Sequence, residues 1–239
     1  MASARELQEQ YYQETARSYD KVHSSEVEHQ IALAYIVPFL NLLDVSTILD
    51  VGCGTGRGLK YFQEKCPRAT LCGIDPGSVL LEQAADRGCN DILVCGSGES
   101  LPFADDSFDA VCEFAILHHV ENPNAVVREM IRVARKAVFI SDANRFGQGG
   151  RVARMLKLAL YKLRLWDAVN FIKTAGKGYS FSEGDGLFYS FSVFDSYQTL
   201  AEWADRIVLV PTAAANSASW FSPLLTSAHV LLCAFKEDQ

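Results

Sequence analysis

No hydrophobic run in this 239-residue chain is long enough to cross a membrane, and the opening Met-Ala-Ser-Ala-Arg-Glu lacks the apolar core of a secretion signal. We therefore expect a cytoplasmic protein. The chain also lacks a Cys-x-x-Cys motif, and its seven cysteines are an odd number. Several of them stand in apolar, strand-like runs, which predicts buried, reduced thiols and no metal site.

An excess of basic residues is also absent. Lys and Arg number 22 against 29 Asp and Glu, a formal net charge of -7 at pH 7, which disfavours a large nucleic-acid interface. The 49% hydrophobic and 21% charged residues suffice for one packed domain, alone or with an appended cap. We expect a small-molecule partner, no nucleic acid, and a monomer or homodimer.

Glycines gather at one turn, Gly52-Cys53-Gly54-Thr55-Gly56-Arg57-Gly58. The apolar run 47–51 before it predicts a buried strand, and the segment after it predicts a helix that begins near Arg57. Glycine allows positive φ and close approach of the backbone to a ligand. The N-terminus of the helix would direct its N–H groups and its dipole at that ligand. The turn therefore predicts a nucleotide or cofactor site on an open α/β sheet.

The spacing of these glycines excludes two common sites. The dinucleotide pattern G-x-G-x-x-G would need glycine where Arg57 or Leu59 stands, and no Gly-Lys-Ser/Thr follows for a phosphate loop. The pattern that is present, an acid followed by three alternating glycines, resembles the first motif of class I S-adenosylmethionine-dependent methyltransferases. Their cofactor has a cationic amino-acid end, which accounts for an acid beside the turn. The resemblance implies cofactor contacts from Asp50, Gly52, Cys53, Gly54 and Gly56.

A second acid, Asp75, ends the apolar run 70–75, about twenty residues beyond the turn, where doubly wound folds place a carboxylate on the ribose hydroxyls. The alternative is that Asp75 caps the next helix, as the adjacent Pro76, Gly77 and Ser78 could also do. We favour the ribose contact and add Pro76 to the cofactor site.

Residues 96–109 resemble the "G-D-A-E-x-L-P-F-x-D-x-S-F-D" segment of the methyltransferase-11 type family. That family places an adenine-binding Asp where this chain has Ser97. A hydroxyl accepts a hydrogen bond without charge, so the adenine contact is made by Ser97 or passes to Glu99. The backbone N–H groups of Gly98 and Glu99 can serve an adenine ring nitrogen with any side chain.

The N-terminal segment offers two interpretations. Residues 12–20 resemble the "Y-x-x-x-A-x-x-Y-D" opening of small-molecule methyltransferases, carried here by Tyr12, Tyr19 and Asp20, which implies that residues 1–30 form a lid over the cofactor. The alternative is a surface helix whose aromatic residues, with His23 nearby, dock on the core.

Strands and helices alternate through the middle of the chain. We expect strands at 47–51, 70–75, 91–95, 109–114 and 136–141, and helices at 31–43, 57–64, 80–87 and 124–135, with Pro38 bending or dividing the first and Asn124 capping the last. This alternation predicts right-handed βαβ units and a parallel sheet over residues 31–142.

Residues 193–239 are expected to complete the sheet, with a helix at 197–204 and strands at 206–210 and 227–235. The fold class is therefore α/β: a doubly wound, seven-stranded, mostly parallel, Rossmann-like methyltransferase sheet whose last strand is antiparallel. His229, in that last strand, is predicted to be a core or sheet-surface histidine and not a catalyst.

Residues 143–192 are too long for an ordinary connection and are predicted to be a cap with a helix at 151–166 and a hairpin at 182–186. The basic side of that helix is either a solvated face or a surface that attracts an anionic substrate, an acyl-carrier partner or a membrane; its residues are Arg151, Arg154, Lys157, Lys162 and Arg164. The aromatic stretch 179–191 forms either the core of the cap or a pocket wall.

Three side chains are candidates for the chemistry. Methyl transfer from a sulfonium is an in-line displacement, and a base helps where the acceptor is a hydroxyl. His118 and His119 follow one predicted strand and Asp142 ends the next, so these residues meet at one edge of the sheet. An imidazole oriented by a carboxylate is a suitable base near neutral pH.

Residues 115–123 also resemble the family segment "L-H-H-V-x-D-P", and natural-product sugar O-methyltransferases carry a His pair and an Asp at these two strand ends. Alternatively, one histidine only flanks the cofactor or caps a helix. The resemblance adds Phe114, Ala115 and His118 to the cofactor site, and Asp185 and Tyr12 are weaker base candidates.

The main hypothesis is an enzyme that transfers a methyl group from S-adenosylmethionine to a small molecule, at a sugar or natural-product hydroxyl oxygen, and releases S-adenosylhomocysteine. N- or C-methylation is the alternative reaction. A non-catalytic cofactor-binding protein on the same fold is a second class, which Ser97 keeps open. The spacing of the glycines opposes a third class, the nicotinamide oxidoreductases.

Overall fold

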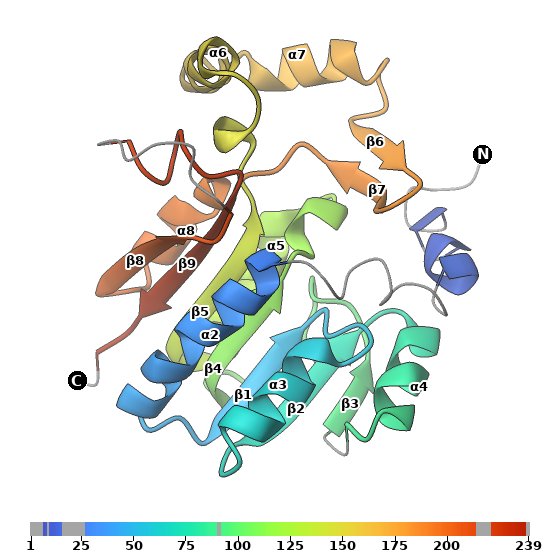
Figure 1. Ribbon diagram of the computed structural model, residues 1–239, viewed down its shortest axis with the longest axis vertical. Helices are drawn as coiled ribbons and strands as arrows, with labels where there is room; N and C mark the ends of the chain where they lie inside the picture. Colours follow the sequence, from blue (N-terminus) through green and yellow to red (C-terminus); the bar gives the residue numbers. More distant parts are fainter. Residues whose placement is uncertain (1–6, 9, 16–26, 90–91, 214–220, 238–239) are drawn as a thin grey trace.

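The computed structural model describes residues 7–8, 10–15, 27–89, 92–213 and 221–237. Tyr19, Asp20 and His23 of the expected lid, and the first residue of the expected third strand, lie outside the described residues. Residues 10–15 are helical, and Figure 1 shows this short helix beside a hairpin of the cap.

The centre of the molecule is a seven-stranded sheet in the order β3-β2-β1-β4-β5-β9-β8. All pairs among the strands β1 to β5 are parallel, and β9 is antiparallel to both of its neighbours, β5 and β8. The predicted fold class is thus confirmed, including the antiparallel last strand. The strands are β1 (Thr47–Val51), β2 (Thr70–Asp75), β3 (Ile92–Cys95), β4 (Phe108–Phe114), β5 (Ala134–Ala143), β8 (Arg206–Pro211) and β9 (His229–Phe235).

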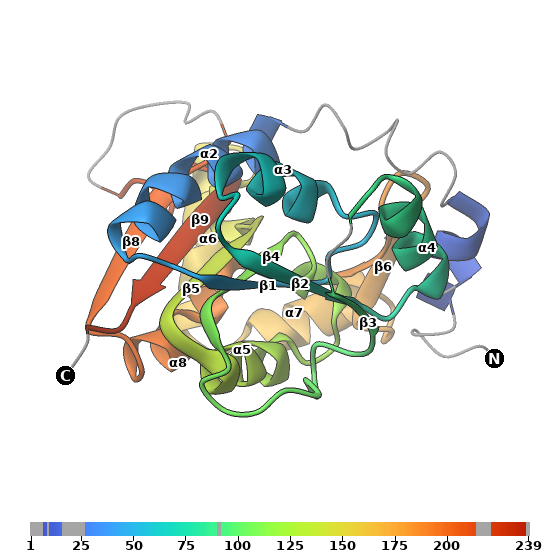
Figure 2. The same cartoon turned by 90° about the horizontal axis from the view of Figure 1, so that it is seen from below.

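Helices cover both faces of the sheet (Figure 2). The face with α2 and α3 has a core that includes Ile48 and Leu33, whereas Leu49 and Met130 belong to the core on the face of α5 and α8. Successive side chains of a strand point to opposite faces, so a strand buried on both faces must be apolar throughout. The helices of the two faces are α2 (Val27–Leu42), α3 (Arg57–Lys65), α4 (Ser78–Asp86), α5 (Pro123–Val133) and α8 (Tyr197–Ala201).

Two helix predictions need correction. The helix expected to be capped by Asn124 begins at Pro123, and its N-cap is Asn122, whose side chain accepts a hydrogen bond from the N–H of Ala125. Proline at the first helical position has no N–H to satisfy, so the residue before it takes the capping role. The helix expected over 151–166 is two helices, α6 (Arg151–Lys162) and α7 (Trp166–Lys173), because Arg164 adopts a left-handed φ of 58°.

The segment between β5 and α8 lies beyond the carboxyl ends of the parallel strands (Figure 1). Besides α6 and α7, it contains η2 (Arg145–Gly147), a hairpin of β6 (Tyr179–Ser182) and β7 (Gly186–Tyr189), and η3 (Val193–Asp195). The hairpin is present where the sequence predicted it, with Ser182 paired to Gly186.

One buried cation holds the base of this segment together. Arg145 lies over the rings of Phe146, Tyr161 and Trp166 at 5.0, 5.3 and 5.5 Å, and its guanidinium contacts both carboxylate oxygens of Asp195 at 2.5 and 2.6 Å. The side chains of Arg145 and Asp195 are 8% and 18% exposed, so this ion pair is largely shielded from water.

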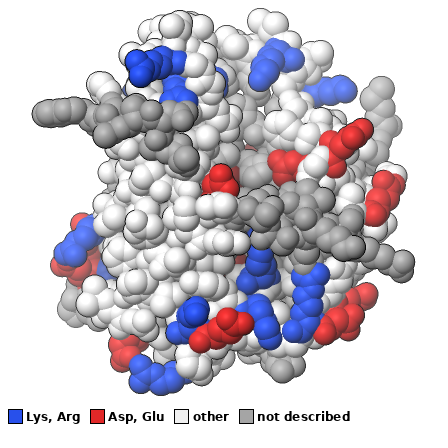
Figure 3. Space-filling model, viewed as in Figure 1, with Lys and Arg blue, Asp and Glu red and all other residues white. Residues whose placement is uncertain are grey.

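Two of the five basic residues on the predicted polar side of α6 contact backbone rather than solvent alone. Arg154 donates to the carbonyls of Gly149 and Leu225, and Lys157 donates to those of Arg145 and Gln148. Every residue of α6 and α7 is at least partly exposed, and Lys and Arg side chains gather at this end of the molecule (Figure 3).

All seven cysteines carry free thiols, as predicted, and five of them are buried: Cys53, Cys72, Cys89, Cys112 and Cys233. Within the described part of the chain, no helix combines the length and apolar character that crossing a membrane requires.

Candidate active site

Two adjoining cavities of about 470 and 440 Å³ lie at the carboxyl ends of the parallel strands. Tyr12, Gly52, Asp75, Ile116 and His119 line both of them, so the two cavities form one divided cleft. A crevice at the carboxyl edge is where open α/β sheets bind their ligands. Each volume is in the range that holds a small organic molecule.

The glycine turn borders the larger cavity. Gly52, Gly54 and Gly56 have φ values of 74°, 51° and 79°, a backbone conformation that side chains rarely allow. The N–H groups of Gly52 and Cys53 both donate to the carbonyl of Ile74, which ties the turn to β2. A Cβ at Gly54 would meet no protein atom within 4 Å, so the space beside Gly54 belongs to the cavity.

Gly56 has a different role from the one expected. It lines neither cavity, and a Cβ there would lie 2.5 Å from Cys89 Sγ and 3.0 Å from Ala84 Cβ. The third glycine of the motif therefore allows close packing against α4, and the expectation of a cofactor contact from Gly56 is not supported by its position.

Asp75 lies between the cleft and the start of α4. It lines both cavities, and its carboxylate accepts hydrogen bonds from the N–H groups of Gly54 at 2.9 Å and Gly77 at 2.7 Å, where Gly77 is the N-cap of α4. Burial raises the pKa of Asp75 to about 6, although the two hydrogen bonds oppose the shift.

Asp50 lies at the inner end of the larger cavity and is 2% exposed. Burial and then the negative charge of Asp75 raise the pKa of Asp50 to about 8, and the nearby Arg57 guanidinium partly offsets them. A carboxyl with this pKa is largely protonated at neutral pH.

The smaller cavity contains the residues that the sequence assigned to the adenine, together with Pro76 of the predicted cofactor site. Pro76, Ser97, Gly98 and Glu99 all line it. The hydroxyl of Ser97 accepts a hydrogen bond from the N–H of Glu99 at 3.2 Å, so these two expected adenine contacts bond to each other. The other two expected contacts, the Glu99 side chain and the Gly98 backbone N–H, take no part in that bond.

His118 and Asp142 meet as the strand order predicts. His118 belongs to η1 (Leu117–His119), and its Nδ1 lies 2.6 Å from Asp142 Oδ1. Asp142 is fully buried behind the imidazole and also accepts from the N–H of Leu117 at 2.8 Å. Asp142 lines neither cavity, so it does not face a ligand there. Its contact with Nδ1 can orient the imidazole of His118. Burial disfavours the charged imidazole, but the carboxylates of Asp142 and Asp185 outweigh it and raise the pKa of His118 to about 10.

Asp185, a weaker candidate from the sequence, lies against both imidazoles. The loop between β6 and β7 brings its Oδ2 to 3.6 Å from His118 Nε2 and its Oδ1 to 3.4 Å from His119 Nε2. His119 Nδ1 in turn lies 2.5 Å from the carbonyl oxygen of Leu187 in β7. Among the described residues, His118, His119 and Asp185 are the set whose donor atoms, within 4.8 Å of one another, could hold a metal ion.

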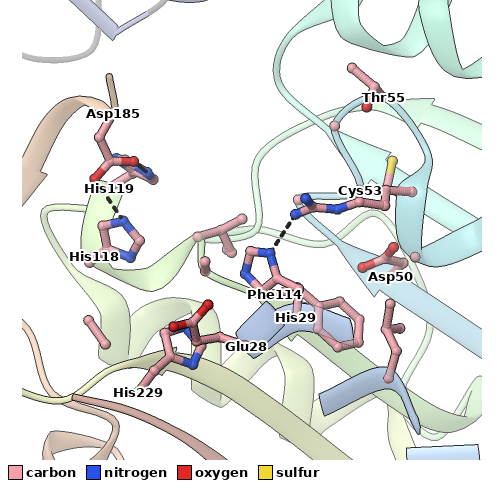
Figure 4. A pocket seen from close by; sticks show the side chains of 18 of the residues that line it. Glu28, His29, Asp50, Cys53, Thr55, Phe114, His118, His119, Asp185 and His229 are labelled. Carbon is pink, nitrogen blue, oxygen red and sulfur yellow. Dashed lines mark hydrogen bonds and ion pairs between the residues drawn. The ribbon is translucent and has the colours of Figure 1, made fainter. Parts of the chain in front are cut away.

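Figure 4 shows the larger cavity between these two groups of residues. On one side are the residues of the glycine turn, and on the other are the histidine pair and the hairpin residue. Phe114 and Ala115, which the sequence assigned to the cofactor, line the same cavity. The side facing the turn can thus hold one ligand while the side facing the imidazoles holds another.

Several residues of this cavity were not predicted from the sequence. Arg57 Nη2 lies 2.5 Å from His29 Nδ1, and the rings of His29 and His229 are 5.7 Å apart. His229 therefore borders the cavity, not only the core or sheet surface. Arg57 could have been identified from its place between the last two glycines of the turn, Gly56 and Gly58, whereas His29 has no spacing signal.

The described part of the expected lid contacts the hairpin. Gln8 accepts a hydrogen bond from the N–H of Leu187 at 2.7 Å, and the Tyr11 hydroxyl donates to the carbonyl of Glu183 at 3.3 Å. Tyr12 lines both cavities, so this helix borders the cleft.

Comparison with known proteins agrees with this geometry. Residues 49–140 match the family model described as a methyltransferase domain. The chain is 38% identical over 93 residues to probable tRNA methyltransferase 9B of Bos taurus, an alignment that covers 39% of this chain and 19% of that protein. It is 29% identical over 101 residues to demethylmenaquinone methyltransferase of Thermotoga maritima, covering 42% and 44% of the two chains.

The chain thus spans about a fifth of the length of the tRNA methyltransferases it matches and less than half of the other relatives compared. The whole chain has the fold of 1,6-didemethyltoxoflavin-N1-methyltransferase from Burkholderia thailandensis, whose structure contains S-adenosylhomocysteine. That similarity has a TM-score of 0.61 at 16% identity and covers 100% of this chain and 92% of the other.

The fold is that of the class I methyltransferases. Within it, residues 49–140 match the methyltransferase domain family, and the Burkholderia neighbour of the same fold contains S-adenosylhomocysteine.

Proposed function

We propose that the protein transfers a methyl group from S-adenosylmethionine to an oxygen of a small molecule, such as a sugar or natural-product hydroxyl. The observation that carries the proposal is the position of the His118–Asp142 pair across one cavity from the glycine turn and Asp50. S-adenosylhomocysteine is the released product.

The cleft fits the cofactor in shape and charge. The open space beside Gly54 admits a ligand against the backbone of the turn, and Asp50 beside it matches a cationic amino group. Asp75 would accept from the ribose hydroxyls, and Pro76, Ser97, Gly98 and Glu99 would enclose the adenine. The bound cofactor would supply an electrophilic methyl group on its sulfonium. The cofactor found in the Burkholderia neighbour supports this assignment.

His118 is the proposed base. Because its Nδ1 is held by Asp142, its Nε2 is the atom that faces the cavity. With a pKa of about 10 the imidazole is protonated near neutral pH, so Nε2 must first lose its own proton before it receives that of the hydroxyl. Asp142 fixes the orientation and the tautomer of the ring. A hydroxyl oxygen beside His118 Nε2 and Asp185 Oδ2 could lie about 2.8 Å from both, since the two atoms are 3.6 Å apart. His119, which also faces the cavity, is the alternative base.

The remaining parts of the chain have roles in the same proposal. Residues 143–192 form the cap over the acceptor side, residues 1–30 form the lid over the cofactor, and residues 31–142 with 193–239 form the core. The free thiols support action in the reducing cytoplasm. The match to tRNA methyltransferases suggests an RNA acceptor, but the formal charge of -7 favours a small molecule.

The test measures transfer of a labelled methyl group from S-adenosylmethionine to a panel of alcohol, amine and carbon acceptors. With the best acceptor, His118→Ala should lower kcat by roughly 10²- to 10⁴-fold, the usual contribution of a general base, while the Kd of S-adenosylhomocysteine changes little. Transfer to amines alone would replace oxygen by nitrogen as the acceptor atom. An unchanged kcat would remove His118 from the role of base.

A further inference from the structure

We propose that His118, His119 and Asp185 bind a divalent transition-metal ion, with Zn²⁺ as the expected ion, on the acceptor side of the larger cavity. All three side chains line this cavity. Two come from η1, which follows β4, and the third comes from the loop of the β6–β7 hairpin, 66 positions later in the chain than His119.

The first support is the choice of ring nitrogens. In both histidines Nδ1 already has an acceptor: Asp142 Oδ1 at 2.6 Å for His118 and the Leu187 carbonyl at 2.5 Å for His119. Metal-binding histidines characteristically donate their second N–H to a carboxylate or a backbone carbonyl, which fixes the other nitrogen as the ligand. Here that arrangement is present twice, and both Nε2 atoms lie near the same carboxylate.

The second support is the spacing of the donor atoms. Nε2 of His119 and of His118 lie 3.4 and 3.6 Å from the oxygens of Asp185. These separations exceed an ordinary N–H···O bond of about 2.7–3.2 Å. The two histidines approach different oxygens of Asp185, and one donor atom from each of the three residues lies within 4.8 Å of the others. Small side-chain movements would bring these atoms to the edge of a tetrahedron, about 3.3–3.4 Å, around an ion with metal–ligand bonds of about 2.0–2.1 Å.

The kind of donor selects the ion. Two imidazole nitrogens and one carboxylate suit zinc and its first-row neighbours, whereas magnesium and calcium prefer oxygen ligands throughout. Three protein ligands leave one tetrahedral position, and the cavity lies beside it. These three residues would therefore form a metal site with one open coordination position, unlike a structural metal site, in which the protein fills all four positions.

Metal binding would have two consequences. It would join the hairpin to η1 through Asp185 and close the acceptor side. It would also occupy the Nε2 lone pair of His118 that the proposed base needs, so the loaded protein should transfer methyl groups poorly. Binding stands independently of the proposed function, and only the inhibition rests on it.

The experiment titrates the chelator-treated full-length protein with Zn²⁺ by calorimetry and with Co²⁺ by visible absorption. We expect about one ion per chain and the intense visible bands of tetrahedral Co²⁺. Asp185→Asn should weaken binding roughly tenfold or more, and Asp167→Asn, an exposed control on α7, should bind like the unchanged protein. Absence of binding, or equal affinity in Asp185→Asn, would overturn the proposal.

Methyl transfer is then measured with and without one equivalent of Zn²⁺, and again after chelation. Inhibition that chelation reverses supports the second consequence, and stimulation by the metal would contradict it. If no acceptor is methylated under any condition, the proposed function fails, while the titrations still decide whether the metal site exists.

Discussion

The backbone N–H of Gly54 donates to Oδ2 of Asp75 at 2.9 Å, which joins the glycine turn after β1 to the end of β2. The other oxygen of the carboxylate holds Gly77 at the start of α4. An ionised carboxylate has about four acceptor positions, so two remain for a ligand in the cleft. One acid thus shapes the turn and presents acceptors to the cleft.

Asp75→Asn should therefore weaken cofactor binding. Hydrogen bonds to a charged group contribute about 1.5–3 kcal/mol each, so the Kd of S-adenosylhomocysteine should rise by roughly tenfold to a hundredfold or more. Calorimetric titration measures this Kd. Asp86→Asn, at the exposed end of α4, is the matched control and should leave it unchanged. Equal affinity in both variants would exclude Asp75 from the cofactor site.

We expect Asp50 to release a proton when the cofactor binds. Its pKa of about 8 keeps the carboxyl largely protonated at pH 7. A cationic amino group beside it favours the ionised form, so the pKa falls and about one proton leaves. Affinity for S-adenosylhomocysteine should consequently increase as pH rises from about 6 to 8.

Calorimetry at pH 7 in buffers of different ionisation enthalpy counts that proton. The observed binding enthalpy should vary with the buffer for the unchanged protein and not for Asp50→Asn. A buffer-independent enthalpy in both proteins would contradict the predicted contact between Asp50 and the amino group.

The buried Arg145–Asp195 pair should stabilise the fold much more than an exposed pair does. Arg145→Ala leaves Asp195, whose side chain is only 18% exposed, without its cation and should lower the free energy of unfolding by about 3 kcal/mol. Arg206→Ala removes an ion pair whose side chains are 68% and 64% exposed, and should cost about 1 kcal/mol or less. Urea unfolding compares the two; similar losses would show that Arg145 does not hold the cap segment in place.

Most of the sheet could be predicted because its strands have clear signals in the local sequence. The strand at 47–51 was predicted with the observed ends, as was that at 70–75, since each is an apolar run that a glycine turn or an acid terminates. The division between α6 and α7 could not be predicted, because neither Gly nor Pro stands at Arg164 and the apolar spacing continues past it.

The residues of the candidate site also differ in how far the sequence could predict them. Gly52, Gly54 and Asp75 follow from spacing along one βαβ unit, so sequence pattern suffices to find them. The contact of Asp185 with the histidines depends on how a hairpin of the cap folds back over η1, and no periodicity encodes that. Gly56 shows the converse, because its motif position suggested a ligand contact and packing against α4 explains it instead.

The most direct test of the central claim is thermal unfolding of the protein with S-adenosylhomocysteine and, separately, with NADH. At a hundredfold excess over its Kd, S-adenosylhomocysteine should stabilise the protein by about 2.7 kcal/mol, and NADH should have no effect. Stabilisation by NADH without any by S-adenosylhomocysteine would contradict the assignment of this cleft to a methyltransferase cofactor.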